Sequence, residues 1–217
     1  MISSTIKRLN DRRDSAEGAG DDAGFTLIEL MVVLLILAIL LAIAIPTFLG
    51  VTKSANDRAA QSNLNTALVN VKSIFQSNSQ SYALLAANST NYTSNNASLV
   101  SSLISAEPNL SFATGAVTSG AAPAQISVAI AQDGNGVVLA EQAKGTGNCW
   151  FVVDNAVAET AALGGTPYTN LTGAVLAAGT YYGEAKNTGT VPTCSALAPP
   201  APATGTIVYQ ASGFPAL

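Results

Sequence analysis

An unbroken apolar run near the start of the chain limits its architecture more than any other feature. Phe25 to Ile45 are 21 consecutive residues with one charged side chain, Glu29. A helix rises about 1.5 Å per residue, so this run would be roughly 30 Å long, which matches the hydrocarbon thickness of a bilayer. The sequence therefore predicts one helix that spans a membrane.

The composition agrees with this prediction and disfavours several classes of function. Only 10% of the residues are charged and the mean hydropathy is +0.35, which is unusual for a cytosolic protein. The net charge is −4 and no cluster of Lys or Arg follows Arg13, so nucleic-acid binding has no support beyond weak or indirect contact. The chain has no His, which disfavours hydrolytic triads and zinc sites. We expect no cofactor and no metal.

The residues before the apolar run do not form an ordinary secretory signal. They are polar and include four basic residues, Lys7, Arg8, Arg12 and Arg13. A secretory signal has a short apolar core followed by a small-residue cleavage site, whereas here the small pair at 23–24 precedes the apolar core. This reversed order indicates a different class of export signal.

The string GFTLIEL at residues 24–30 resembles the class III signal of type IV pilins and type II secretion pseudopilins. In that family a membrane prepilin peptidase cuts after the glycine and methylates the new N-terminal amine. The resemblance therefore implies cleavage between Gly24 and Phe25, an N-methylated Phe25 and a leader at residues 1–24. It covers roughly residues 20–75 and includes Pro46, where the family often has a proline. The five acidic residues of the leader depart from the short basic leaders of many relatives.

Glu29 is the charged residue of the apolar run, and two interpretations of it are open. A carboxylate in a membrane helix costs about 3 kcal/mol, and such residues usually have a partner. Glu29 could simply be tolerated near the headgroups and the positive helix N-terminus. Alternatively, as the resemblance also implies, Glu29 of one subunit pairs with the Phe25 amine of a neighbour and sets the assembly register. We favour the second interpretation.

Beyond the apolar run the helical pattern becomes one-sided. Pro46 removes one backbone hydrogen bond, which predicts a kink or a local loosening over residues 42–46, or a bend without function at the membrane exit. Apolar residues then recur at helical spacing, at Leu64, Ala67, Leu68, Val71, Ile74 and Phe75. We expect one helix from about 25 to 76, with a transmembrane and filament-core part at 25–46 and an amphipathic stem at 47–77 that docks on a sheet.

Residues 78–217 are expected to form an exported β-rich domain. Strand-like runs occur at 124–132, 136–143 and 148–154, and weaker ones at 180–185 and 206–210, with a short helix at 98–106. The Asp-Gly-Asn-Gly string at 133–136 is a strong hairpin signal; a calcium loop is the weaker interpretation, because the turn has no second acidic residue. The fold class is α+β, with the long helix packed on a small antiparallel sheet, as in type IV pilins.

Cys149 and Cys194 both follow the apolar run, and an exported domain would oxidise them to a disulfide. In many pilins such a late disulfide bounds the variable surface region, so the resemblance implies that partners are met there. Trp150 is expected in the core. Asn-Cys-Trp at 148–150 and Gly-Phe-Pro at 213–215 are compatible with pilins of Gram-positive bacteria. Five Asn-x-Ser/Thr sequons are expected in exposed segments, at Asn88, Asn91, Asn96, Asn109 and Asn170.

The resemblance implies a structural, non-enzymatic subunit of a type IV pilus, used in adhesion, twitching motility or DNA uptake. It would be a single-pass protein of the cytoplasmic membrane first and part of an extracellular filament later. Its partners would be prepilin peptidase, other copies of itself and an assembly machine with a cytoplasmic ATPase. The alternatives are a type II secretion or competence pseudopilin, and a membrane-anchored enzyme or sensor, although no catalytic constellation stands out.

Overall fold

The computed structural model describes residues 25–85, 92–117, 125–159, 177–189, 191–199 and 207–216. The predicted leader, with Gly24 at its cleavage site, lies outside the described residues. The chain divides into two compact units, Met1–Phe48 and Leu49–Leu217.

Helix α2, Leu27–Ser77, contains the apolar run and the amphipathic stem without a break, so the prediction of one long helix is confirmed. Its residues in the first unit are exposed on every side. Pro46 lies inside the helix and does not end it. One position on, Thr47 Oγ1 donates a hydrogen bond of 2.9 Å to the carbonyl of Ile43. The kink at Pro46 stays a prediction.

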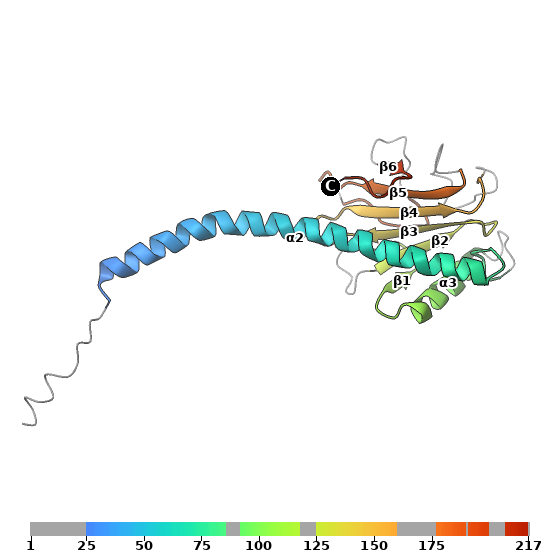
Figure 1. Ribbon diagram of the computed structural model, residues 1–217, viewed down its shortest axis with the longest axis horizontal. Coiled ribbons are helices and arrows are strands. Elements are labelled where there is room, and N and C mark those ends of the chain that lie inside the picture. Colours follow the sequence, from blue (N-terminus) through green and yellow to red (C-terminus); the bar gives the residue numbers. More distant parts are fainter. Residues whose placement is uncertain are drawn as a thin grey trace, which may run out of the picture. The chain divides into compact units, whose positions relative to one another are not determined.

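The second unit contains a six-stranded sheet whose strands lie side by side in chain order (Figure 1). Its strands are β1 (Ser111–Ala113), β2 (Gln125–Ile130), β3 (Gly136–Gln142), β4 (Cys149–Asn155), β5 (Gly179–Ala185) and β6 (Ile207–Gln210). The strands from β2 to β6 pair antiparallel, which confirms the five predicted strands. β1 pairs parallel with β2, so the sheet is mixed and not purely antiparallel. Three residues are too few to show the two-residue period of a strand.

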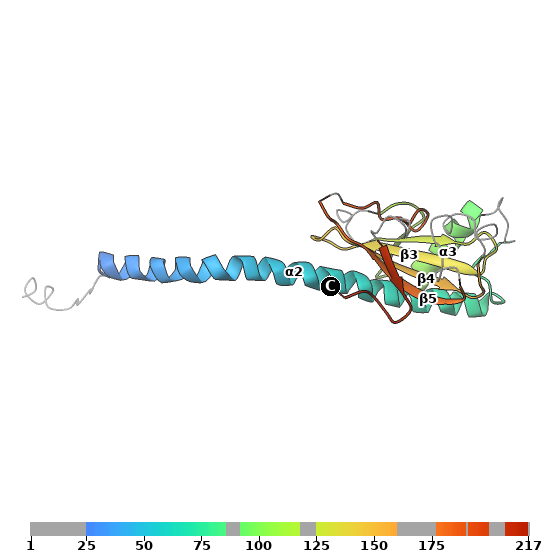
Figure 2. The same ribbon diagram turned by 90° about the horizontal axis from the view of Figure 1, so that it is seen from above.

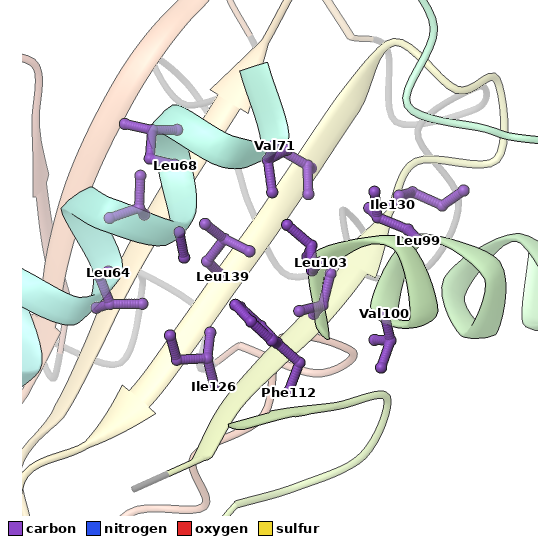
Figure 3. Packing of buried hydrophobic residues seen from close by; sticks show 14 of the residues in the cluster. Leu64, Leu68, Val71, Leu99, Val100, Leu103, Phe112, Ile126, Ile130 and Leu139 are labelled. Atoms are coloured by element: carbon purple, nitrogen blue, oxygen red, sulfur yellow. The ribbon is translucent and has the colours of Figure 1, made fainter. Parts of the chain in front are cut away.

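One face of the sheet is covered by the stem part of α2 and by helix α3, Tyr92–Ala106 (Figures 1 and 2). The predicted stripe is buried here, with Leu64, Ala67 and Val71 fully inaccessible. Leu64 and Val71 belong to one buried cluster with Leu99 and Leu103 of α3, and Figure 3 shows all four side chains against the strands. The prediction that the stem docks on a sheet is therefore confirmed.

Helix α3 begins at Tyr92, whereas the sequence predicted a start at residue 98. Two asparagines in its first turns explain the difference. Asn95 Oδ1 accepts the Leu85 amide at 2.6 Å, and Asn96 Oδ1 accepts the Ile130 amide at 2.8 Å. Because Asn96 is only 2% exposed, the expectation of an exposed sequon there is wrong. Asn109 is exposed as expected, and the sequons at 88, 91 and 170 lie outside the described residues.

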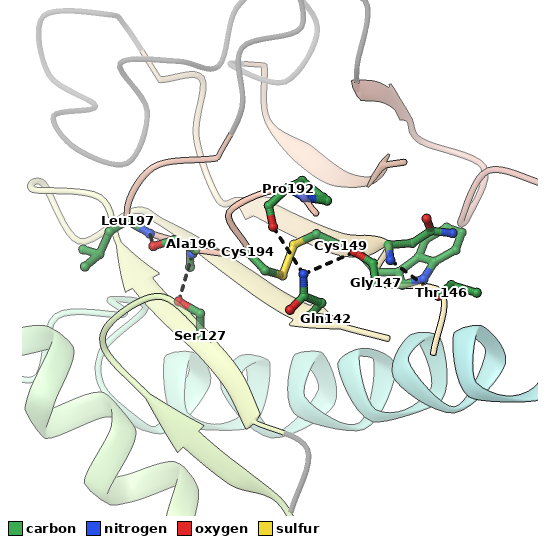
Figure 4. The surroundings of a disulfide bond; sticks show 12 residues. Ser127, Gln142, Thr146, Gly147, Cys149, Pro192, Cys194, Ala196 and Leu197 are labelled. Carbon is green, nitrogen blue, oxygen red and sulfur yellow. Dashed lines mark hydrogen bonds between the residues drawn. A yellow bond between two sulfur atoms is a disulfide. The ribbon is translucent and has the colours of Figure 1, made fainter. Parts of the chain in front are cut away.

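The opposite face of the sheet is covered by the segment that carries Cys194. The predicted disulfide is confirmed: Cys149 and Cys194 are joined, with 5.4 Å between their Cα atoms, and both are buried (Figure 4). The Ala196 amide donates to Ser127 Oγ at 2.9 Å, and Gln142 Nε2 donates to the Pro192 carbonyl at 3.2 Å. These bonds hold the segment from residue 192 to 197 against the sheet.

Candidate assembly site at the helix N-terminus

The first turn of α2 contains a reciprocal pair of hydrogen bonds between Thr26 and Glu29. Thr26 directly precedes the helix and Glu29 is its third residue. The Thr26 amide and hydroxyl donate to Glu29 Oε2 at 2.8 and 2.7 Å, and the Glu29 amide donates to Thr26 Oγ1 at 3.3 Å. This is the capping box, in which two side chains satisfy amides that the helix leaves without partners.

The capping box changes how the charge of Glu29 is accommodated. A carboxylate in the first turn also lies at the positive end of the helix dipole. The first interpretation of Glu29, a residue tolerated at the helix end, therefore has a defined geometry. The sequence signature Thr-x-x-Glu was present, and our sequence analysis overlooked it.

The second carboxylate oxygen of Glu29 leaves room for the other interpretation. Both bonds from Thr26 end on Oε2, so Oε1 can accept from a further donor. Phe25, four residues earlier, is 86% exposed. The arrangement combines an exposed residue at the predicted cleavage site with an anionic acceptor one helical turn away.

The remaining predicted site residues are not part of this cluster. Pro46 lies near the end of the first unit, and the Cys149–Cys194 disulfide belongs to the second. Among the residues that the structure describes, no group of three or more acidic or cysteine side chains is arranged to hold a metal ion.

Sequence analysis also missed a polar contact that fixes the stem to the sheet. Asp57 of α2 is 3% exposed, and its Oδ1 accepts Trp150 Nε1 at 3.0 Å and Thr146 Oγ1 at 2.9 Å. Asp57 extends the apolar stripe backwards at helical spacing, through Ala60 to Leu64. The periodicity could thus have identified it as a buried position.

A second buried carboxyl group faces the stem from β3. Asn63 Nδ2 of α2 donates to Glu141 Oε1 at 2.9 Å, while Glu141 Oε2 has no hydrogen-bond partner in the described part of the chain. Glu141 is 2% exposed, and this burial raises the pKa of its carboxyl to about 7.

The far end of the stem has its own polar contact. Asp154 of β4 accepts Lys72 Nζ of α2 at 2.9 Å, and it also accepts hydrogen bonds from the hydroxyls of Tyr82 and Thr180. Asp154 and Tyr82 are buried. Polar contacts therefore flank the apolar stripe of the stem at both ends.

Comparison with known proteins places the N-terminal site in context. Residues 21–45 match the family model described as the prokaryotic N-terminal methylation motif. The chain is 40% identical over 90 residues to the type IV wide pilus major component PilA4 of Thermus thermophilus. The match covers 41% of this chain and 60% of the relative's length. No solved structure matches the chain.

Proposed function

Because this chain carries a type IV prepilin signal, we propose that it is a structural subunit of a type IV pilus that polymerises through its N-terminal helix. The observation that carries the proposal is the methylation motif on a helix whose residues 27–48 are almost all apolar and are exposed on every side in the part of the first unit that the structure describes. The relative's name as a pilus major component favours a pilin over a type II secretion or competence pseudopilin. Nothing in the proposal requires catalysis.

Maturation begins with prepilin peptidase. It hydrolyses the peptide bond between Gly24 and Phe25, which releases residues 1–24. It then transfers a methyl group from a sulfonium methyl donor to the new amine of Phe25, which breaks the donor's S–C bond, leaves a thioether and releases one proton. The product is a secondary ammonium next to the exposed first turn of α2. The methyl group adds little bulk and keeps the positive charge.

Assembly brings this ammonium to Glu29 of a neighbouring subunit. Glu29 Oε2 remains bonded to Thr26, and Oε1 accepts the ammonium. Either charge would be costly to bury alone, and the pair offsets part of that cost, so a subunit placed out of register would leave a buried charge without a partner. Since the pair forms at one axial offset only, it defines the step between subunits.

The first part of α2 has two different surroundings, one before assembly and one after it. Before assembly its apolar side chains face the lipid, and the precursor is a single-pass protein of the cytoplasmic membrane. After extraction by a machine with a cytoplasmic ATPase, they face the same helix of neighbouring subunits. A contact of this kind that repeats without closing produces a helical filament.

Mass spectrometry and electron microscopy of sheared surface material test the proposal. We expect a mature chain that begins with N-methyl-phenylalanine at Phe25 and long fibres that an antibody against the second unit labels. A Gly24→Val variant is the control, because it should leave the leader attached and the surface without labelled fibres. Unmethylated full-length chain, or the absence of labelled fibres from the wild type, would contradict the proposal.

A further inference from the structure

The exposed cations of the second unit gather at one end of it. After the predicted leader the chain contains five Lys or Arg residues. Lys72 is paired with Asp154 at the far end of the stem. The other four are exposed, and we call them the basic collar: Lys53, Arg58, Lys144 and Lys186. Lys186 also forms an ion pair of 3.7 Å with the buried Glu184.

Direct contacts place the segments of the basic collar together. Thr146, in the β3–β4 turn beside Lys144, donates its hydroxyl to Asp57 of α2 at 2.9 Å. A Cβ atom added to Gly145 would lie 3.8 Å from Lys53 Cγ. Asn187, next to Lys186, donates its Nδ2 to the Thr146 carbonyl at 2.9 Å. Figure 4 shows Thr146 and Gly147 at this end of the strands.

The acidic residues of the same region are buried under the basic collar. Asp57, Glu141 and Glu184 are each less than 5% exposed. Burial raises the pKa of Glu141 to about 7 and also raises the pKa of Glu184, although Lys186 opposes that second shift. The shift of Glu141 reduces the negative charge under the surface at neutral pH. Solvent at this end of the unit therefore meets mainly positive charge.

Chain connectivity keeps the basic collar close to the membrane. Lys53 follows Ile45, the last residue of the apolar run, by eight positions of the same helix. Eight residues of α-helix span about 12 Å. The headgroup layer adds about 5–7 Å to each side of the hydrocarbon, and the Debye length at 0.1 M salt is about 10 Å. The cations thus lie within electrostatic reach of the lipid surface.

We propose that the basic collar binds anionic phospholipid headgroups on the side of the membrane where α2 emerges, before the subunit enters a filament. The inference rests on the proposed membrane insertion of the apolar run. A lipid surface is favoured over nucleic acid because the cations come from three segments that meet near the start of the second unit, where the chain leaves the apolar run. A membrane is the surface that this position meets in every inserted subunit.

Electrostatic attraction to an anionic leaflet changes the contact equilibrium about fivefold for each Lys or Arg near the surface. Four such residues hold the second unit against the headgroups while the subunit waits for extraction. The assembly machine must then break these contacts as well as withdraw the apolar helix.

The single tryptophan of the chain, Trp150, allows the proposal to be tested in the full-length protein. It lies buried next to Asp57, at the same end of the unit as the basic collar. The protein is reconstituted into phosphatidylcholine vesicles with or without phosphatidylglycerol, and all vesicles contain a trace of headgroup-dansylated lipid. Energy transfer from Trp150 to dansyl then reports how close the unit lies to the headgroups.

We expect higher energy transfer with phosphatidylglycerol, a loss of the difference at high salt, and about a fivefold weaker anionic-lipid effect in Lys144→Gln. Lys72→Gln is the matched control, since it removes one cation at the far end of the unit. Circular dichroism verifies that each variant is folded. Equal transfer in both lipids, or an equal loss in both variants, would overturn the proposal. Failure to float with either vesicle would instead overturn the membrane insertion on which it rests.

Discussion

At the scale of single residues, Glu29 can serve two partners with two oxygens. Thr26 occupies Oε2 in the isolated subunit, and the proposed ammonium of a neighbour would occupy Oε1. The two interpretations that the sequence left open therefore do not exclude each other. The first stabilises the helix end, and the second would join subunits.

Substitution of Glu29 separates these two roles. We expect Glu29→Ala to leave cleavage at Gly24 intact and to abolish filaments, because both roles are lost. Glu29→Gln retains an oxygen for Thr26 but carries no charge, so it should fail to assemble as well. Mass spectrometry of the N-terminus measures cleavage, and electron microscopy counts the filaments. Normal filaments from Glu29→Gln would show that capping alone matters.

Glu141 makes the stability of the second unit depend on pH. Its pKa is raised to about 7 in the folded state from an ordinary value of 4.5, so the folded state binds a proton more tightly than the unfolded state. The contribution of Glu141 to the free energy of unfolding should therefore be greatest below about pH 4.5, and it should be lost as the pH rises through 7. The loss is on the order of 3 kcal/mol.

Thermal unfolding of the full chain in detergent, followed by Trp150 fluorescence at about pH 5 and about pH 8, measures this dependence. We expect the difference in unfolding temperature between the two pH values to be smaller for Glu141→Gln than for the wild type. Burial and Asp133 also raise the pKa of Glu159 to about 7, so Glu141→Gln should reduce the wild-type difference without removing it. The prediction fails if Glu141→Gln keeps the full wild-type difference.

At the scale of elements, the helices and strands with a clear local pattern of apolar residues could be predicted from the sequence. The stripe on α2 was predictable because its apolar residues repeat at helical spacing. The five strands of the antiparallel part were predictable as short runs rich in apolar and aromatic residues. Strand β1 and the start of α3 were not predictable in this way. Asn96 belongs to a helix because its side chain reaches the Ile130 amide, 34 positions away, and no local pattern contains that contact.

The candidate site divides along the same line. The two cysteines were recognisable from residue type and order, while cleavage at the Gly24-Phe25 bond and the assembly role of Glu29 stay predictions. The capping box was also local, and its signature was overlooked. By contrast, the bond between Asp57 and Trp150 joins residues 93 positions apart, so its existence depends on how the stem docks.

The disulfide should stabilise the second unit mainly by restricting its unfolded state. The bond closes a loop of 45 positions, for which the chain-entropy model gives about 4 kcal/mol. We expect the double variant Cys149→Ala/Cys194→Ala to unfold at a clearly lower temperature, measured by fluorescence of Trp150. Reductant should have little effect on the folded wild type, since both sulfurs are buried. The same unfolding temperature for variant and wild type would contradict the prediction.

At the scale of the whole molecule, the two units differ in where their apolar side chains lie. The second unit has its own buried clusters on both faces of the sheet. The first unit has no buried residues among those that the structure describes, so its apolar side chains need lipid or other copies of the chain. The subunit is therefore incomplete without a membrane or a filament around it.

A chain that begins at Leu49 tests this division. When residues 49–217 are exported with an ordinary cleavable signal, we expect a soluble monomer with the disulfide formed and no filaments. Size-exclusion chromatography, circular dichroism and thiol titration measure the three properties. An unfolded or aggregated product would show that the second unit depends on the apolar run for its fold.

The capping box has a consequence for the two tips of a fibre. Oε1 of every Glu29 would accept from one ammonium, and every processed chain would supply one ammonium. Each interior subunit would therefore form two such contacts, one through its Glu29 and one through its own N-terminus. The terminal subunits lack one partner each. One tip would thus present carboxylates without an ammonium, and the other would present ammonium groups without a carboxylate. The two tips of such a fibre differ in charge, so another protein could bind one tip and not the other by electrostatic attraction alone.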